Sequence, residues 1–203
     1  MLSTIKHDLH ALMNGVLANQ LRERGMRYRI IYGVELPRLA LYAEELKKEV
    51  VEPQARYDLA QSLWKTETRE CRLLTPMLAP PERLLPEVAD IWLEQAHTQE
   101  EVSCLVRYLF CRTPFASDKA FQWMADEREM LQLGGFLLVA QLMRRGGTLA
   151  PRDEAELLDQ AEAALQATNT LCRKAAYNAL LCLAEKGLRQ ERLVETLLKR
   201  HGL

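Results

Sequence analysis

The chain has 203 residues, of which 48% are hydrophobic and 27% are charged, which is enough for the core of one or two ordinary domains. It has no apolar run of the roughly 20 residues that a membrane helix needs, and no secretory signal at its start. We therefore expect a cytoplasmic protein with no membrane partner. The net charge of −1 argues against a surface that is basic all over and binds nucleic acid everywhere. It does not exclude a basic stripe on one face, because an acidic face elsewhere can balance its charge.

The first fifty residues are expected to form two helices joined by a loop. Residues 3–24 carry leucine and methionine at helical spacing after a Ser-Thr pair that can cap a helix, and Gly25 suits the position just past the end. Residues 26–36 alternate briefly but have no strand to pair with, which favours an extended loop. Pro37 suits the first position of the next helix. The inner face of that helix is predicted to hold Leu39, Tyr42, Ala43 and Leu46.

A degenerate repeat follows in residues 57–146. Trp64, Trp92 and Trp123 lie about 30 residues apart, a spacing typical of helical repeats. Each tryptophan is near the end of an apolar segment, which a polar or acidic corner separates from a second, aliphatic segment. The pattern predicts three pairs of helices, each with a tryptophan near the end of its first helix.

Capping signals place several of the predicted helix starts. Thr98 with Glu101 has the form of a capping box, and Asp126 with Glu129 resembles one. Ser117 is expected to cap the helix that follows Pro114. These positions divide the second and third pairs into their separate helices.

The segment 130–143 is apolar nearly all round and should lie at the centre of the fold, with a neighbouring helix packed closely against Gly134 and Gly135. Residues 153–166 and 169–185 predict a fourth pair, and residues 188–201 a terminal helix. The expected fold is all-α, a right-handed superhelix of stacked antiparallel helical pairs of the HEAT-like or armadillo type. We expect one domain over residues 1–203, divided into N-terminal helices (1–50), three Trp-bearing pairs (57–146) and a C-terminal pair with a terminal helix (152–203).

The sequence contains no motif for nucleotide binding, metalloprotease chemistry or serine hydrolysis. The five cysteines lack zinc spacing and are expected to be buried, reduced thiols. His7 and His10 lie three residues apart on the first helix, but no third metal ligand is nearby. We therefore expect neither a metal nor a cofactor.

Basic residues on the second helices are the strongest functional signal. In a stack of helical pairs the second helices usually line the concave face, where a row of guanidinium groups can track phosphates. The alternative is that these side chains pair with nearby glutamates in surface networks of small energetic worth. The candidate DNA-binding residues are Arg69, Arg72, Arg107, Arg112, Arg128, Arg173 and Lys174, and the candidate glutamate partners are Glu67, Glu70, Glu101 and Glu129.

From the first helix to about Arg145, the chain resembles the DNA alkylation repair family, the HEAT-like alkylpurine DNA glycosylases. The segments that carry the resemblance are Tyr32–Arg38 (YGVELPR), Leu63–Trp64 through Glu70–Arg72, Arg112–Ala120 (RTPFASDKA) and Phe121–Asp126 (FQWMAD). The resemblance implies a concave, positively lined groove that holds double-stranded DNA. It also implies hydrolysis of the N-glycosidic bond of cationic alkylated purines without a metal or cofactor.

The residues that the family uses for catalysis are not matched in this chain. The resemblance would place the family's catalytic aspartate near Val102, with a tryptophan near Thr98. It would place an arginine near Leu133 and a second tryptophan near Asn178. All four positions hold other residue types, and Glu101 is the candidate acid that remains.

Two functions from different classes follow. The first is a DNA-binding member of the family, either with weak or altered N-glycosylase activity through Glu101 or with its catalysis lost. The alternative is a non-enzymatic HEAT-like scaffold that binds a protein or peptide on its concave face. The sequence does not determine which DNA lesion the protein would recognise, which partner it would bind or its oligomeric state.

Overall fold

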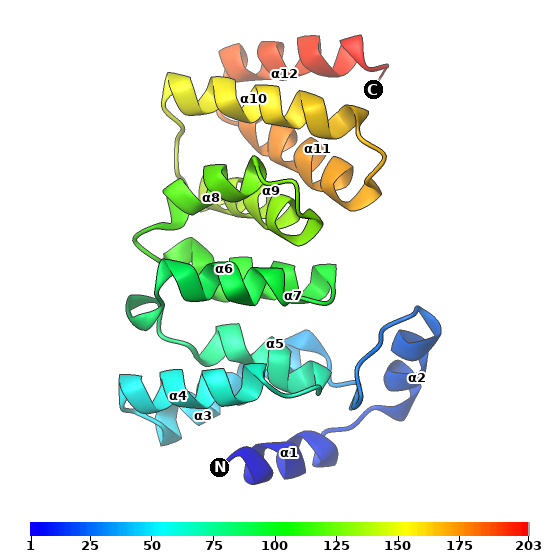
Figure 1. Ribbon diagram of the computed structural model, residues 1–203, viewed down its shortest axis with the longest axis vertical. Coiled ribbons are helices and arrows are strands. Elements are labelled where there is room, and N and C mark those ends of the chain that lie inside the picture. The colour runs from blue at the N-terminus through cyan, green and yellow to red at the C-terminus, as the bar shows by residue number, and fades with distance from the viewer. Residues whose placement is uncertain (203) are drawn as a thin grey trace. The chain divides into compact units, whose positions relative to one another are not determined.

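The computed structural model describes residues 1–202, and within them it is built of helices joined by short turns and loops (Figure 1). In that part of the chain, the extended backbone pairs in one isolated parallel bridge, between Ile30 and Thr68. The prediction of an all-α chain is therefore confirmed. Among the same residues, no helix is both long and apolar enough to span a bilayer. The chain divides into two compact units, Met1–Leu85 (unit 1) and Pro86–Leu203 (unit 2), which we describe separately.

Unit 1 contains five α-helices and one short 3₁₀ helix. They are α1 (Leu2–Ala11), α2 (Gly15–Glu23), α3 (Leu36–Glu49), α4 (Pro53–Trp64), α5 (Arg69–Leu78) and η1 (Pro81–Arg83). Helix α5 packs against α3 and α4, and all ten of its residues are buried. It is therefore the central helix of unit 1, although its sequence includes three charged residues and Pro76.

The prediction of one helix over residues 3–24 is wrong, because the chain breaks after Ala11 and a second helix begins at Gly15. Asn14 produces the break. Its side chain accepts a hydrogen bond from the backbone N–H of Leu17, and its own N–H donates to the carbonyl of Tyr32. An asparagine that caps a new helix competes with continuation of the old one. Helix α2 then packs Ala18 and Leu21 against Ile31 of the following loop.

The loop between α2 and α3 is extended, as predicted. Gly25 has a φ of 87° just past the end of α2, a conformation that glycine adopts without steric cost. Within the loop, Ile30 pairs with the corner between α4 and α5: its N–H donates to Glu67 O at 3.2 Å, and its carbonyl accepts from Arg69 N at 3.0 Å. A segment far away in sequence is thus tied to the start of α5.

Unit 2 stacks three helical pairs and a terminal helix (Figure 1). Its elements are α6 (Pro86–Glu94), α7 (Gln99–Cys104), the π-helical turn η2 (Leu105–Leu109), the 3₁₀ turn η3 (Phe110–Arg112), α8 (Ala116–Met124), α9 (Glu129–Arg144), α10 (Pro151–Gln166), α11 (Thr170–Ala184) and α12 (Leu188–Arg200). Helix α9 packs against α6, α7, α8 and α11. It therefore occupies the centre of unit 2, as its nearly uniform apolar sequence predicted.

The three tryptophans end the first helices of their pairs or lie close to those ends, and all three are buried. Trp123 packs its ring against Phe110, with centroids 5.2 Å apart, and its Nε1–H donates to Asp90 at 2.7 Å. Lys119 donates to the other oxygen of the same carboxylate at 2.6 Å. Trp123 therefore joins α8 to α6 as well as filling the core.

The glycine pair in α9 marks close helix packing, as predicted. A Cβ on Gly134 would lie 2.6 Å from a methyl carbon of Leu93 on α6. A Cβ on Gly135 would lie 2.2 Å from the backbone nitrogen of Met124 on α8. The backbone of α9 can approach α8 this closely only because no side chain separates the two helices.

One of the three capping predictions, the pair of Thr98 and Glu101 at the start of α7, is confirmed. Thr98 accepts a hydrogen bond from the N–H of Glu101, and the carboxylate of Glu101 accepts one from the N–H of His97 at 2.8 Å. The prediction for Asp126 and Glu129 is wrong: Asp126 accepts a hydrogen bond from the N–H of Arg128, but Arg128 is itself the capping residue before α9, and no side chain caps that helix. The prediction for Ser117 is wrong: α8 starts one residue earlier, with Phe115 at the capping position and no side-chain cap.

The prediction for the cysteines is confirmed, because all five are buried and free. Burial raises the pKa of the Cys172 thiol to about 11, helped by the negative charge of Glu129, so this thiol stays protonated at neutral pH. The five are Cys71, Cys104, Cys111, Cys172 and Cys182.

Candidate nucleic-acid interface

A hollow of about 440 Å³ in unit 2 gathers three arginines. It lies between the second helix of the first pair in this unit (α7 with η2) and the second helix of the next pair, α9. Among the described residues, its lining contains no carboxylate. The lining residues are Ser103, Arg107, Leu137, Gln141, Arg144 and Arg145. We call this the arginine hollow.

Local backbone structure positions these arginines. Arg107 lies in the π-helical turn, where the helix after α7 widens before tightening again to a 3₁₀ turn. Such turns are rare and are often found at functional sites. Arg144 and Arg145 form the end of α9, where the helix dipole favours positive charge. Gly146, with a φ of 94°, then turns the chain away.

The three guanidinium groups are exposed, and within the described part of the chain none of them forms an ion pair. Arg144 donates to the side-chain oxygen of Asn178 on α11 at 2.6 Å. Burial raises the pKa of the Cys111 thiol, and the charge of Arg145 partly opposes this rise. The arginine hollow is therefore an exposed concentration of positive charge, in which one guanidinium donates to a neighbouring amide and none is neutralised by a carboxylate within the described residues.

Arg69 and Arg72 lie elsewhere, inside unit 1. Arg69 is 3% exposed and donates to Val34 O at 3.2 Å and to the carboxylate of Glu70 at 2.8 Å. Arg72 is 6% exposed, donates to Trp64 O at 3.0 Å, and holds its guanidinium carbon 3.8 Å from the centroid of the Trp64 ring. Their surroundings are those of structural arginines, because both guanidinium groups are buried and donate to groups inside unit 1.

Glu101 is 1% exposed and its carboxylate caps the start of α7, as described above. A carboxylate in this position stabilises the helix through the exposed amide groups of its first turn. Catalysis by Glu101 stays a prediction, and it requires a substrate to reach a side chain that the fold covers.

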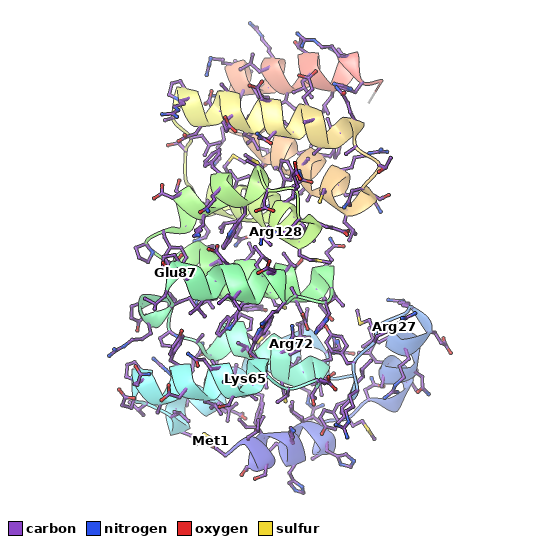
Figure 2. All side chains as sticks on the ribbon, viewed as in Figure 1. Met1, Arg27, Lys65, Arg72, Glu87 and Arg128 are labelled. Atoms are coloured by element: carbon purple, nitrogen blue, oxygen red, sulfur yellow. The ribbon has the colours of Figure 1, made fainter. Side chains whose placement is uncertain are left out.

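The other predicted contacts lie on the surface of unit 2. Arg128, labelled in Figure 2, bonds to Asp126 at 2.7 Å and to Glu94. Its hydrogen bonds lower the pKa of the Asp126 carboxyl to about 2. This is the surface network that was the alternative to phosphate binding. Arg173 donates to the carbonyl of Ala167, while Arg112 and Lys174 are exposed and form no ion pair within the described residues.

The positions that correspond to the family's catalytic residues have structural contacts here. Val102 and Leu133 are fully buried in the core, and Thr98 caps α7. Asn178 is bound to Arg144. No described side chain at these four positions is an acid or an aromatic ring.

Sequence reasoning missed Arg144 and Arg145. The apolar pattern predicts a helix that ends at Met143, so the basic pair that follows lies outside the predicted second helix. The sequence feature that points to these residues is two adjacent arginines before a glycine pair. The same feature also fits the ordinary preference for positive charge at the C-terminal end of a helix.

Comparisons with known proteins agree with the resemblance. The profile of the family described as "DNA alkylation repair enzyme" matches residues 5–202. A solved structure is similar in fold, with a TM-score of 0.83 and 16% sequence identity over 97% of this chain and 81% of that one. That protein is described as belonging to a new family related to the HEAT-like repeat DNA glycosylases, with affinity for branched DNA structures. A search of curated proteins gave no match. Because the family profile covers nearly the whole sequence, this chain belongs to the DNA alkylation repair enzyme family.

Proposed function

We propose that this protein binds DNA and that the arginine hollow of unit 2 contacts the phosphate backbone. The observation that carries the proposal is the clustering of Arg107, Arg144 and Arg145 around a hollow without a carboxylate. Guanidinium groups bind phosphate oxygens through paired hydrogen bonds, and Ser103 and Gln141 add further polar groups. Family membership supports DNA as the source of the phosphates.

Binding without efficient base excision is the form of this function that the residues favour. The candidate acid Glu101 is covered by its own fold, and the four positions that correspond to the family's catalytic set hold other residues. The similar solved protein is described by its affinity for branched DNA. We therefore propose branched DNA, alongside simple duplex, as the first ligand to examine.

The test compares the binding of a 30-base-pair duplex and a four-way junction over a range of salt concentrations. The double variant Arg107→Ala/Arg145→Ala should reduce the log–log salt slope by about 1.8, which corresponds to two phosphates. Its affinity should fall by about tenfold or more, as expected for charge-assisted contacts. The matched control is Arg192→Ala/Arg200→Ala, which removes two exposed arginines from α12. Equal losses in both variants would remove the arginine hollow from the proposal.

Residual catalysis through Glu101 is a separate question with its own measurement. Release of 7-methylguanine from methylated DNA should be followed for the wild type and for Glu101→Gln. Release by the wild type that is lost in the variant would assign weak glycosylase activity to Glu101. Equal release by both would exclude Glu101 from the reaction, and no release by either would leave a binding protein.

A protein-binding scaffold is the second candidate function, favoured by the net charge of −1. A scaffold of this kind would show no affinity for duplex or junction at moderate salt. A wild-type protein that binds neither DNA at low ionic strength would overturn the DNA-binding proposal and favour the scaffold.

A further inference from the structure

Unit 1 contains a second basic hollow, separate from the arginine hollow, with a volume of about 670 Å³. Three segments far apart in sequence form it: α1, the loop that follows α2, and the corner between α4 and α5. Its lining residues are Lys6, Arg29, Ile30, Lys65, Thr66, Glu67 and Thr68. Figure 2 labels Lys65, which begins the corner. We call this the lysine hollow.

Backbone contacts fix the position of the loop that carries Arg29. The next residue, Ile30, forms hydrogen bonds through both its N–H and its carbonyl to residues of the corner. Two residues after Ile30, the N–H groups of Tyr32, Gly33 and Val34 all donate to the buried carboxylate of Glu70. Arg29 therefore starts from a backbone that is held against the corner, so its approach to Lys65 is a property of the fold.

The lysine hollow brings together three cations and one carboxylate. Lys6 is half-buried, while Arg29, Lys65 and Glu67 are exposed. Within the described part of the chain, none of the three cations forms an ion pair. Beneath the corner, burial raises the pKa of the Cys71 thiol, while a hydrogen bond with Thr66 and the charge of Lys6 oppose this rise. Like charges that line one hollow repel each other, and an anion bound among them would relieve that repulsion.

We propose that the lysine hollow binds a phosphate of the DNA backbone, as a contact additional to those of the arginine hollow. Cations from three separate segments surround one site, which suits a tetrahedral oxyanion approached from several directions. None of the described lining residues is aromatic, so nothing in this hollow can stack a base. The contact is therefore one to the sugar–phosphate backbone, independent of sequence. The identity of the polyanion rests on the proposed function.

Lysine footprinting of the unmodified protein tests this contact directly. The full chain is treated with an amine-acylating reagent, with and without saturating 30-base-pair duplex, and modification is measured by mass spectrometry. Acylation of Lys65 should slow by about threefold or more in the complex, because a bound phosphate neutralises and covers the ammonium group. Lys48, exposed on α3 in the same unit, is the control and should react at an unchanged rate. Equal rates for Lys65 in free and bound protein would overturn the proposal.

A charge-matched pair of triple variants provides the second test. Lys6→Ala/Arg29→Ala/Lys65→Ala should lower duplex affinity by about tenfold and reduce the log–log salt slope by at least about 0.9. The control, Arg24→Ala/Arg38→Ala/Lys48→Ala, removes three cations of unit 1 that do not line the hollow and should have a smaller effect. If the wild type binds DNA and both triple variants bind alike, the lysine hollow is not a phosphate site and the arginine hollow is unaffected. If the wild type binds no DNA, the proposed function falls, and this contact falls with it.

Discussion

At the scale of single residues, Glu70 organises unit 1. Its carboxylate is fully buried and accepts hydrogen bonds from the N–H groups of Tyr32, Gly33 and Val34, at 3.0, 2.9 and 3.3 Å, and from Arg69 at 2.8 Å. A buried charge is tolerated only when it is paired and hydrogen-bonded in this way. Gly33 lets the loop come close, because a Cβ there would lie 2.3 Å from the carbonyl oxygen of Asn14.

Replacing Glu70 by glutamine should destabilise the protein by about 3–5 kcal/mol. The variant removes the charge that pairs with Arg69 and leaves that guanidinium buried with its main partner weakened. Urea unfolding monitored by circular dichroism gives the free energy of unfolding. Glu82→Gln, an exposed glutamate in η1 of the same unit, is the control and should change stability by less than about 0.5 kcal/mol. A similarly small change for Glu70→Gln would contradict the central role of this carboxylate.

At the scale of secondary-structure elements, the packing of α8 on α9 depends on Gly135. Gly135→Ala should destabilise the protein by about 1–3 kcal/mol or more, because the new methyl group would overlap the backbone of Met124 and the carbonyl of Ala120. The usual gain from alanine in a helix is about 1 kcal/mol and cannot offset this overlap.

Gly15→Ala is the matched control for this substitution. Gly15 is also a helical glycine, although it is the first residue of α2 whereas Gly135 is inside α9, and a Cβ there would have no heavy atom within 4 Å. Thermal unfolding should show a lower Tm for Gly135→Ala and an equal or slightly higher Tm for Gly15→Ala. Equal Tm values for Gly135→Ala and the wild type would show that α8 and α9 are free to move apart.

The attachment of α12 to α10 should depend on pH. Glu154 accepts hydrogen bonds from Gln190 at 2.7 Å and from Arg189 at 2.6 Å, and these two contacts, in that order, lower its pKa below the ordinary value of 4.5. A carboxyl whose folded pKa is lowered contributes stability above its unfolded pKa and loses that contribution as the pH falls through the folded value.

Glu154→Gln should therefore lower the free energy of unfolding by about 1–2 kcal/mol at pH 7. The difference between wild type and variant should shrink when both are unfolded in urea at a pH below 4.5. A difference that stayed constant from neutral to acidic pH would mean that the ionised carboxylate is not what holds α12.

At the scale of the whole molecule, a ligand that binds only the folded chain must stabilise it. Duplex DNA at about 100 times its Kd should raise the free energy of unfolding by about 2.7 kcal/mol at low salt. The measurement is urea unfolding with and without DNA, and the Arg107→Ala/Arg145→Ala variant should show a smaller increase at the same DNA concentration. Identical unfolding curves for the wild type with and without DNA would speak against the proposed function.

Much of the fold was predictable, because its signals are local. The Thr98–Glu101 capping box acts within a few residues, the glycine pair at 134 and 135 marks contacts with the adjacent helices α6 and α8, and the tryptophan spacing repeats along the chain. The break after Ala11 was missed because Asn14 also bonds to Tyr32, a partner that sequence periodicity does not reveal. The predicted single domain and its superhelical course stay predictions.

The candidate site was harder to predict, because a charged side chain on the second helix of a pair can be either buried in the fold or exposed to solvent. Arg69 and Arg107 are both arginines on the second helix of a pair, yet one is 3% exposed and the other lines an open hollow. Arg69 has the acidic neighbour Glu70 and Arg107 does not, but a neighbouring carboxylate does not by itself predict burial. Arg69 is buried because Val34, from the loop before α3, offers it a carbonyl at 3.2 Å.

The sequence by itself determined that this chain is helical, that its helices come in pairs and that it carries the likeness of its family, because periodicity, caps and composition are short-range properties of the chain. Only the tertiary structure decided which cations are buried as supports and which gather, exposed, around the two hollows. That division depends on how segments tens of residues apart come together, such as those that bring Lys6, Arg29 and Lys65 to the lining of one hollow, and no local pattern encodes this arrangement.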